Sequence, residues 1–405
     1  MNQNPFSRFR LLFLTLLAVA FSCSAFAQSR EGVSGGTVTV TGSRDLVPVV
    51  ARSSNPATLE ILQSAFTVHG GYQVVESMQD ASFAIAIEPS GPTGARLVIS
   101  SGVPERQQFA ETLTGEDGYS AILRAVDRAI FKTSGKPGFF SGKLVFVSED
   151  TGTSEIYTSD FLFRNMTRLT SDGVNAVRPH WSPDGDSILY TSYKNGFPDI
   201  HRLDLRNRRR EVVVDFKGTN MGARYSPDGS RIALIISGGR NADVWVREAN
   251  GQFRNLTKSS GLEAAPCWSP DGSRIVFSSD QNGGVQLFVV PSFGGQMRRL
   301  RTDISGYCAE PDWNPVDPNK IAFTAAMGSG YQLAVYDMNE GKSRFITSER
   351  GDAIEPQWLS DGRHIVYTHR RANSSQIKIV DTLSLKSANL SGGRSKISQP
   401  SFIAE

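Results

Sequence analysis

The pattern of apolar and polar residues divides the chain into two regions, and the first, up to about residue 135, mixes helical and strand periods. An apolar stripe with helical spacing begins after Asn55-Pro56 and stops at Gly70-Gly71, which predicts a helix with a polar cap, a proline in its first turn and a glycine at its end. A second stripe predicts a helix over 119–131. Runs of β-branched residues predict strands around Val38 and Val40 and at 47–50, 82–88, 95–101 and 107–113. We therefore expect a small α/β domain here.

The second region repeats itself. Its aromatic landmarks are separated by 44, 43, 45, 45 and 44 residues, and they are Trp181, Tyr225, Trp268, Trp313, Trp358 and Phe402. Around them recurs the motif Pro-x-Trp-Ser-Pro-Asp-Gly, followed by β-branched and aromatic runs. A repeat of roughly 40 to 45 residues built from short strands has the length of one four-stranded propeller blade. The sequence thus predicts an all-β six-bladed β-propeller with WD40-like (PD40) repeats.

The phase of the repeat predicts how the ring closes. The first unit begins at 143–148, which matches a second strand, while the last ends at 399–402 with no strand after it. We expect these two ends to complete one blade, so that no sheet edge is left open. The Asp residues of the Ser-Pro-Asp-Gly segments are expected to stabilise tight turns rather than to act as acids or ligands.

The expected organisation has four parts. Residues 1–27 resemble a signal peptide, with Arg8 and Arg10 before an apolar run and the small-x-small pattern Ala25-Phe26-Ala27 at the cleavage point; a membrane anchor or a lipoprotein signal at Cys23 are the alternatives. An α/β domain with a mobile leading segment occupies 28–135, a linker 136–142 and the propeller 143–405. A formal net charge of +3 on 405 residues argues against nucleic-acid binding. Cys267 and Cys308 are expected to be two separate thiols, with one bridge as the alternative.

The inner strands predict the lining of the propeller mouth. The residues before and after the motif proline point away from the packed aromatic residue. In ring order they place a basic pair of blades opposite an acidic pair, which predicts a polarised funnel whose charges are free to orient a partner. The alternative is that these groups pair with adjacent blades or with solvent. The positions are Arg178 and His180, Gly222 and Arg224, Ala265 and Cys267, Glu310 and Asp312, Glu355 and Gln357, and Gln399 and Ser401.

Six such repeats behind a leader and a small α/β domain resemble the TolB family of the Tol-Pal system. Glu310-Pro311-Asp312-Trp313 and Glu355-Pro356-Gln357-Trp358 carry the Glu-Pro-x-Trp form seen in that family. The resemblance implies a periplasmic adaptor, expected to be monomeric, that supports outer-membrane integrity and constriction during cell division. It implies no enzyme activity, no catalytic residue, no metal and no cofactor.

The resemblance also implies two protein partners, with indirect association with the outer membrane and peptidoglycan. The propeller mouth takes the peptidoglycan-associated lipoprotein, and the leading segment 28–41 engages the carboxy-terminal domain of a TolA-like protein. At the leading segment the implied contacts are Val33, Val38 and Val40. At the mouth they are Arg178, His180, Asn220, Arg224, Glu263, Glu310, Asp312, Glu355 and Gln357.

Two other classes of function stay open at this point. One is a periplasmic propeller that binds glycan or a different envelope protein. The other is a propeller hydrolase or lyase. The sequence lacks a Gly-x-Ser-x-Gly elbow and a His-Glu-x-x-His pair, and its five histidines do not cluster, which argues against the second class.

Overall fold

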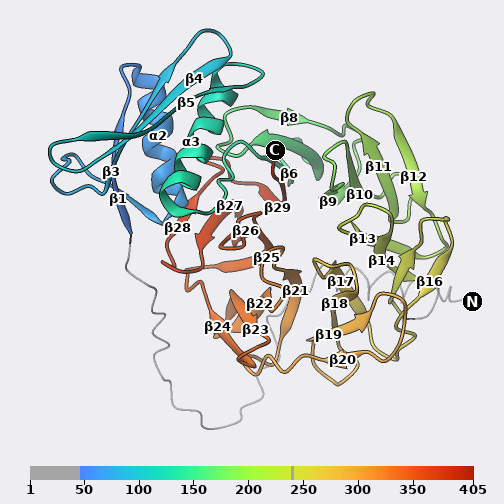
Figure 1. The fold of residues 1–405 in the computed structure, drawn as a ribbon. Helices are drawn as coiled ribbons and strands as arrows, with labels where there is room; N and C mark the ends of the chain where they lie inside the picture. The colour runs from blue at the N-terminus through green and yellow to red at the C-terminus, as the bar shows by residue number, and fades with distance from the viewer. Residues whose placement is uncertain (1–45, 239–240) are drawn as a thin grey trace, which may run out of the picture. The chain divides into compact units, whose positions relative to one another are not determined.

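The structure, a computed structural model, describes residues 46–238 and 241–405, which belong to one compact unit. Within these residues it contains one five-stranded sheet with two helices, followed by six four-stranded sheets (Figure 1). The predicted fold class, a six-bladed β-propeller preceded by a small α/β domain, is confirmed. The leader, the segment 28–41 and the strands expected around Val38 and Val40 lie outside the described residues.

The α/β domain has its strands in the order β2-β1-β3-β4-β5, in which β1 pairs in parallel with both β2 and β3. The strands are β1 (Val47–Arg52), β2 (Tyr72–Val74), β3 (Phe83–Pro89), β4 (Gly94–Ser101) and β5 (Arg106–Thr114). The sequence pattern located each of them except the three-residue β2. Helices α2 (Pro56–His69) and α3 (Gly118–Ser134) share one cluster of buried side chains with this sheet.

Both helices begin and end at the signals that the sequence carries. The Asn55 side chain accepts a hydrogen bond from the Thr58 backbone N–H, and Gly70 ends α2 with a φ of 71°. In α3, Asp117 and Ser120 form a reciprocal capping box, and Gly135 has a φ of 71°. Local capping therefore fixes the ends of both helices, because it satisfies backbone groups that have no partner inside the helix.

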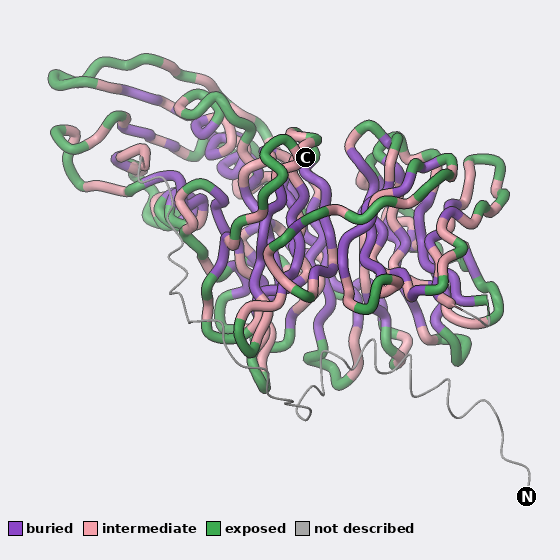
Figure 2. Tube along the Cα trace, turned by 90° about the horizontal axis from the view of Figure 1, so that it is seen from below, coloured by how far each residue is buried: buried purple, intermediate pink, exposed green. Residues whose placement is uncertain are grey.

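The six blades contact one another in ring order through their inner strands. Blade 1 has the order β29-β6-β7-β8 and the others run consecutively outward from β9, β13, β17, β21 and β25. Buried residues run along the strands, and exposed residues gather in the turns at both ends of the blades (Figure 2). Blades 1 and 2 consist of β29 (Ile397–Ile403), β6 (Lys143–Ser148), β7 (Glu155–Asp160) and β8 (Met166–Arg168), then β9 (Ala176–Trp181), β10 (Ser187–Ser192), β11 (Asp199–Asp204) and β12 (Arg210–Val214).

The other four blades follow the same plan. Blades 3 and 4 consist of β13 (Thr219–Tyr225), β14 (Ile232–Ser237), β15 (Asp243–Arg247) and β16 (Phe253–Asn255), then β17 (Glu263–Trp268), β18 (Arg274–Ser279), β19 (Gln286–Pro291) and β20 (Arg298–Arg299). Blades 5 and 6 consist of β21 (Cys308–Trp313), β22 (Lys320–Met327), β23 (Gly330–Asp337) and β24 (Lys342–Phe345), then β25 (Asp352–Trp358), β26 (His364–Arg371), β27 (Ser374–Asp381) and β28 (Ser387–Asn389).

The strand pairing that closes the ring is the one that the phase of the repeat predicts. β29 pairs antiparallel with β6, from Ile397 opposite Ser148 to Ile403 opposite Lys143. Phe402 is buried in the same cluster as Leu144 and Phe146 of β6, and the Trp181 indole N–H of blade 2 donates to the Ser401 carbonyl over 3.1 Å. Blade 1 therefore consists of two segments that are far apart in the sequence.

The Ser-Pro-Asp-Gly turns are held by their own side chains. In blade 2 the Ser182 hydroxyl donates to the Asp184 carboxylate, which also accepts from the Asp186 N–H over 3.0 Å, and Gly185 has a φ of 73°. In blade 4 the equivalent hydrogen bonds lower the pKa of Asp271 to about 2, and the bond from the Ser269 hydroxyl has the largest effect. These contacts account for the aspartates as turn residues, as expected.

The α/β domain is attached to blade 6 by a buried pair of histidines. The Nε2 atom of His364 lies 2.6 Å from the carbonyl of His69, the last residue of α2, and its Nδ1 atom lies 2.5 Å from a carboxylate oxygen of Asp361. A carbonyl oxygen can only accept, so the Nε2–H donates to His69, while the second contact ties the same ring to Asp361. Burial lowers the pKa of His69 well below its ordinary value, and His69 stays neutral and accepts from the Gly71 N–H.

Shortening the carboxy-terminal strand tests the closure of the ring. Deleting residues 399–405 removes most of β29 and exposes the edge of β6, so we expect the propeller to lose about 3 kcal/mol or more of unfolding free energy. Differential scanning calorimetry of the shortened and full chains measures the change. Deleting only 404–405, which lie beyond β29, is the control, since it removes just the partly exposed ion pair between Arg124 and Glu405. Equal unfolding temperatures for all three proteins would contradict this closure.

Replacing His364 tests the attachment between the domains. His364→Phe removes the imidazole contact of the buried Asp361 carboxylate and the hydrogen bond to His69, so we expect a loss of about 3 kcal/mol or more in chemical denaturation. The double variant His364→Phe with Asp361→Asn removes that buried charge and should regain part of the loss. If the single and double variants unfold at the same denaturant concentration as the natural chain, the pair contributes nothing to the interface.

Candidate functional site

The inner strand of every blade bulges at the residue before the motif proline or its counterpart. There the register with the second strand shifts, and the residue takes a positive φ between 50° and 65°. Left-handed backbone is costly for residues with side chains, so six repetitions indicate a feature that the fold requires. The six residues are Arg178, Gly222, Ala265, Glu310, Glu355 and Gln399.

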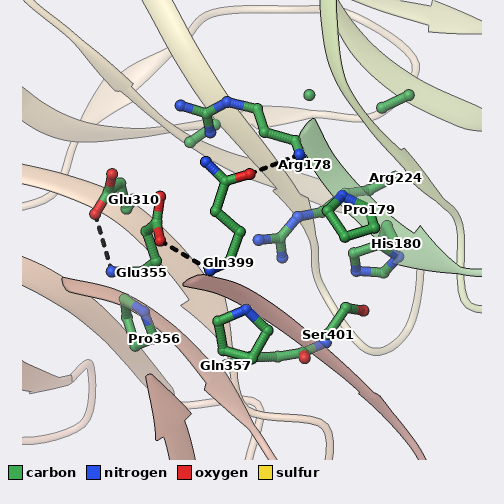
Figure 3. A pocket seen from close by; sticks show the side chains of 14 residues that line it. Arg178, Pro179, His180, Arg224, Glu310, Glu355, Pro356, Gln357, Gln399 and Ser401 are labelled. Atoms are coloured by element: carbon green, nitrogen blue, oxygen red, sulfur yellow. Dashed lines mark hydrogen bonds between the residues drawn. The ribbon is translucent and has the colours of Figure 1, made fainter. Parts of the chain in front are cut away.

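All six of these residues line one pocket on the axis of the propeller, which we call the axial pocket (Figure 3). Its volume is about 70 Å³, enough for a few water molecules or the end of one side chain. The side chains of His180, Arg224 and Gln357 also line it. The structure therefore brings together seven of the nine mouth residues implied by the sequence in or directly beside one site, since Asp312 bonds to Arg224 just behind the wall.

Hydrogen bonds between successive blades hold the left-handed residues in place. The Gln399 side chain accepts from the Arg178 N–H over 2.7 Å, Glu355 accepts from the Gln399 N–H over 3.2 Å, and Glu310 accepts from the Glu355 N–H over 3.0 Å (Figure 3). We call this set the backbone ladder. The hydroxyls of Thr324 and Thr368 donate to Glu310 and Glu355 respectively. The carboxylates of the pocket are thus acceptors for backbone groups that a bulge leaves without a strand partner.

A second row of contacts lies two residues further along each inner strand. The Gln357 side chain accepts from the Phe402 N–H, the Asp312 carboxylate from the Trp358 N–H over 2.9 Å, and the Cys267 sulfur from the Trp313 N–H over 3.3 Å. Cys267 and Cys308 are both free thiols and both buried. Cys267 therefore has a structural position, and burial raises its pKa to about 12.

The expected polarised funnel is partly neutralised inside the wall. Arg224 forms an ion pair with Asp312, which is 5% exposed, so neither charge is free to meet a partner. Burial raises the pKa of Asp312 and outweighs the opposite effect of Arg224. The expectation that Arg224 and Asp312 act as free mouth charges is corrected: their inner strands belong to blades 3 and 5, and the two side chains meet beside Cys267 of blade 4, the one blade between them.

The groups that remain available in the axial pocket are few. The Arg178 guanidinium has no ion-pair or hydrogen-bond partner among the described residues, and it extends across Gln399 (Figure 3). Burial, assisted by Arg224, lowers the pKa of His180 to about 3, so its ring is neutral and its Nδ1–H donates to the Trp181 carbonyl. Burial and the charge of Glu310 raise the pKa of Glu355. Among the described residues, the pocket thus offers the Arg178 guanidinium and the neutral His180 ring, while Glu310 and Glu355 already accept hydrogen bonds from backbone N–H groups.

Two residues implied for the mouth do not line the pocket. Asn220 is fully buried and its amide donates to the Phe216 carbonyl over 2.7 Å. Glu263 is 2% exposed and accepts from the hydroxyls of Ser259, Ser279 and Thr257. Burial raises the pKa of Glu263 to about 7. The implied contacts at Val33, Val38 and Val40 lie outside the described residues.

Some contributors to the site were not singled out from the sequence. Three threonines occupy the same position in the second strand of their blades: Thr191, Thr324 and Thr368. The Thr191 hydroxyl accepts from the Gly222 N–H over 3.3 Å. The recurring run Ile-x-Phe/Tyr-Thr carries this signal in the sequence. The threonine of this run predicts the position of the hydrogen bonds between inner strands, because its hydroxyl contacts a pocket carboxylate or a backbone N–H of the next blade.

Within 46–238 and 241–405, the structure holds no group of three or more His, Cys, Asp or Glu side chains arranged to bind a metal ion. The same stretch contains no helix that combines the length and the apolar character needed to cross a membrane.

Removing Arg224 tests its structural role. Arg224→Leu leaves a buried carboxylate at Asp312, so we expect a loss of about 3 to 5 kcal/mol of unfolding free energy. Arg224→Leu combined with Asp312→Asn should recover much of this loss, because the asparagine oxygen still accepts from the Trp358 N–H without a charge. Urea denaturation of both variants gives the comparison. A stable, natively folded Arg224→Leu protein would restore Arg224 as a free contact residue.

The raised pKa of Glu263 predicts a pH dependence. Between about pH 4.5 and 7 the folded chain keeps a proton that the unfolded chain releases, so stability falls as the pH rises through this window. Glu263→Gln mimics the protonated form, and we expect it to be more stable than the natural chain at pH 8 by up to about 3 kcal/mol. The difference should shrink towards pH 4.5. If the difference in unfolding free energy between the two proteins stays constant from pH 4.5 to 8, the pKa of Glu263 is not raised.

A model of a known protein family, described as the TolB beta propeller domain (PD40), matches residues 131–403, which is more than half of the chain. Two curated relatives named Tol-Pal system protein TolB, from Anaeromyxobacter dehalogenans strain 2CP-1 and Anaeromyxobacter sp. strain K, are each 33% identical over 155 residues. These alignments cover 38% of this chain and 36% of each relative, so the chain spans little more than a third of the curated relatives it matches.

Solved structures agree on the fold. The crystal structure of TolB from Acinetobacter baumannii superposes with a TM-score of 0.80 at 21% sequence identity, covering 89% of this chain and 97% of that chain. A chain from a nidogen/laminin complex has a TM-score of 0.53 at 13% identity and covers 64% of this chain. At such low sequence identities these structures show only a shared fold, whereas the family model that matches residues 131–403 shows membership of the family. Through its propeller, its repeats and that match, the chain belongs to the TolB β-propeller family.

Proposed function

We propose that the protein is a periplasmic adaptor of a Tol-Pal system of the cell envelope. It binds the peptidoglycan-associated lipoprotein at the axial pocket and the carboxy-terminal domain of a TolA-like protein through residues 28–41, including Val33, Val38 and Val40. It works as a monomer, reaches the outer membrane and peptidoglycan only through its partners, and supports outer-membrane integrity and constriction during division. Family membership and the names of the curated relatives support this proposal.

The observation that carries the proposal is the composition of the axial pocket. It combines the Arg178 guanidinium, which has no ion-pair partner among the described residues, with a neutral imidazole at His180, both on the inner strand of blade 2. A pocket of about 70 Å³ suits the tip of a side chain from a partner's loop rather than a whole ligand. Such a site recognises a partner by a few polar contacts and by shape.

The same geometry favours binding over catalysis. Glu310, Glu355 and Gln399, the polar groups nearest to Arg178, are each occupied by a backbone N–H of the next blade. A carboxylate that is held as a structural acceptor is poorly placed to transfer protons to a substrate. Binding to glycan alone is the second candidate, because a neutral imidazole and an arginine also suit sugar hydroxyls and carboxylates.

Arg178→Gln tests the pocket without disturbing its backbone. Glutamine already occupies the equivalent left-handed position at Gln399 in blade 1, so the change should leave the fold intact. We expect capture of the soluble lipoprotein domain from the same organism to weaken by about 1 kcal/mol or more, as measured by calorimetry. Arg208→Gln, at an exposed turn of blade 2, is the matched control and should bind as the natural chain does.

The outcomes separate the classes of function. Unchanged binding by Arg178→Gln would move the interface away from the pocket. Sedimentation of the protein with purified peptidoglycan in the absence of lipoprotein would favour the glycan binder. Turnover of a saccharide or peptide substrate would reject the adaptor role.

Truncation tests the second partner. A protein that starts at Asp45 lacks the proposed contact segment but keeps every described element. We expect it to lose capture by the TolA-like carboxy-terminal domain in a pull-down while retaining the thermal unfolding temperature of the longer chain. Full capture by the truncated protein would place this contact elsewhere in the molecule.

A further inference from the structure

A shallow basic groove opens beside the axial pocket, on the hairpin end of blade 6. Its volume is about 460 Å³, and it is lined by Arg350, Gly351, Arg371 and Ala372. Both arginines are exposed, and neither has an ion-pair or hydrogen-bond partner for its side chain within the residues that the structure describes. A Cβ at position 351 would meet the Arg370 carbonyl oxygen at 2.5 Å and the Arg371 side chain at 3.1 Å, so this close approach of the two segments requires glycine.

A third arginine adjoins this groove. The tip of the β26–β27 hairpin, which carries Arg371, contacts the loop after β28: the Ser375 N–H donates to the Ser395 carbonyl over 2.8 Å, and the Gln376 amide donates to the Arg394 carbonyl over 3.3 Å. The half-buried Arg394 side chain also has no ion-pair or hydrogen-bond partner among the residues that the structure describes. We call Arg350, Arg371 and Arg394 the basic rim. It ends near Lys396, whose carbonyl accepts from the N–H of the acidic residue Glu149.

The basic rim lies next to the mouth of the axial pocket. Arg370 is paired with Asp352 over 2.8 Å at the start of β25, between the groove and the channel. Glu355, which lines the pocket, follows three residues later on the same strand, or about 10 Å along it. A molecule that reaches into the pocket from this end of the propeller therefore passes the rim.

Other unpaired arginines on the surface lack this setting. Arg208 and Arg209 are exposed in the β11–β12 turn, at the opposite end of their blade from its β10–β11 hairpin. Arg298 and Arg301 are exposed on and after the outermost strand of blade 4. Neither pair belongs to the residues that line the axial pocket or the groove of blade 6. The rim stands out because unpaired like charges, an open groove and the recognition pocket coincide.

We propose that the basic rim binds an acidic polypeptide segment of the protein that occupies the axial pocket. The inference rests on the proposed function, and it adds a second contact region to it. The pocket has room for little more than one side-chain tip, so most of a partner's footprint must fall outside it. Three guanidinium groups that have no ion-pair partner among the described residues offer bidentate sites for Asp and Glu side chains. Their main effect is on the rate of association and its salt dependence.

The test uses the full chain and two double variants. Arg371→Gln with Arg394→Gln removes two charges from the rim, and Arg208→Gln with Arg209→Gln removes two from the remote turn. Association of the soluble lipoprotein domain is measured by surface plasmon resonance at low and high salt. We expect the rim variant to associate about 10-fold more slowly at low salt, with little difference at high salt, and the control to match the natural chain. If the rim variant associates with the lipoprotein domain as fast as the natural chain does at low salt, the inference about the rim is wrong, while the proposed binding at the axial pocket is unaffected.

A second measurement separates this inference from the proposed function. A fluorescein-labelled peptide of about ten glutamates is titrated by anisotropy into all three proteins, beside soluble peptidoglycan fragments. If the natural chain and the control variant bind the peptide but the rim variant does not, the basic rim binds acidic polypeptide even if the lipoprotein is not its partner. No binding of the peptide to the natural chain, or rim-dependent binding of the glycan fragments in its place, would reject an acidic polypeptide as the occupant.

Discussion

The backbone ladder is the interaction on which the rest of the propeller depends. A bulge in each inner strand frees a backbone N–H that faces the neighbouring blade, and in three successive blades a side chain from the previous blade accepts it. A buried N–H without a partner costs about as much as a lost hydrogen bond, so each contact fixes the spacing of two blades. The same bulges turn their side chains into the channel. Packing of the blades and the shape of the pocket are therefore consequences of one geometry.

This shared origin limits which residues of the pocket can evolve or be mutated freely. Glu310, Glu355 and Gln399 are both wall and scaffold, so changing them alters a neighbour's backbone as well as the surface. Arg178 is different, because only its backbone belongs to the ladder, while its guanidinium forms no hydrogen bond or ion pair with the described residues. Arg224 reaches the wall too, but it is neutralised by Asp312. Specificity is thus expected to vary at Arg178 and on the rim, where contact with a partner carries no structural cost.

Much of the architecture could be predicted from the sequence, because it is written in local signals. The caps of α2 at Asn55 and Gly70, the turn chemistry of Ser182 and Asp184, and the phase of the repeat all act within a few residues. The site was harder. No local rule predicts a left-handed residue before a proline, since that position normally favours extended backbone. The pairing of Arg224 with Asp312 spans 88 residues of sequence, and the burial of Asn220 and Glu263 depends on loops of neighbouring strands.

Blade 1 gives the propeller an unusual order of assembly. Its inner strand and its second strand are about 250 residues apart, so their pairing closes a very long loop. Closing such a loop costs chain entropy before the contacts between the two strands can compensate for it. Blades 2 to 6 are each made of neighbouring segments and can form their hairpins early. Until β29 docks, β6 presents a bare edge beside the apolar residues that receive Phe402, a surface on which another chain could pair. Late closure of the ring would make this open-edged intermediate the folding species with the greatest tendency to aggregate.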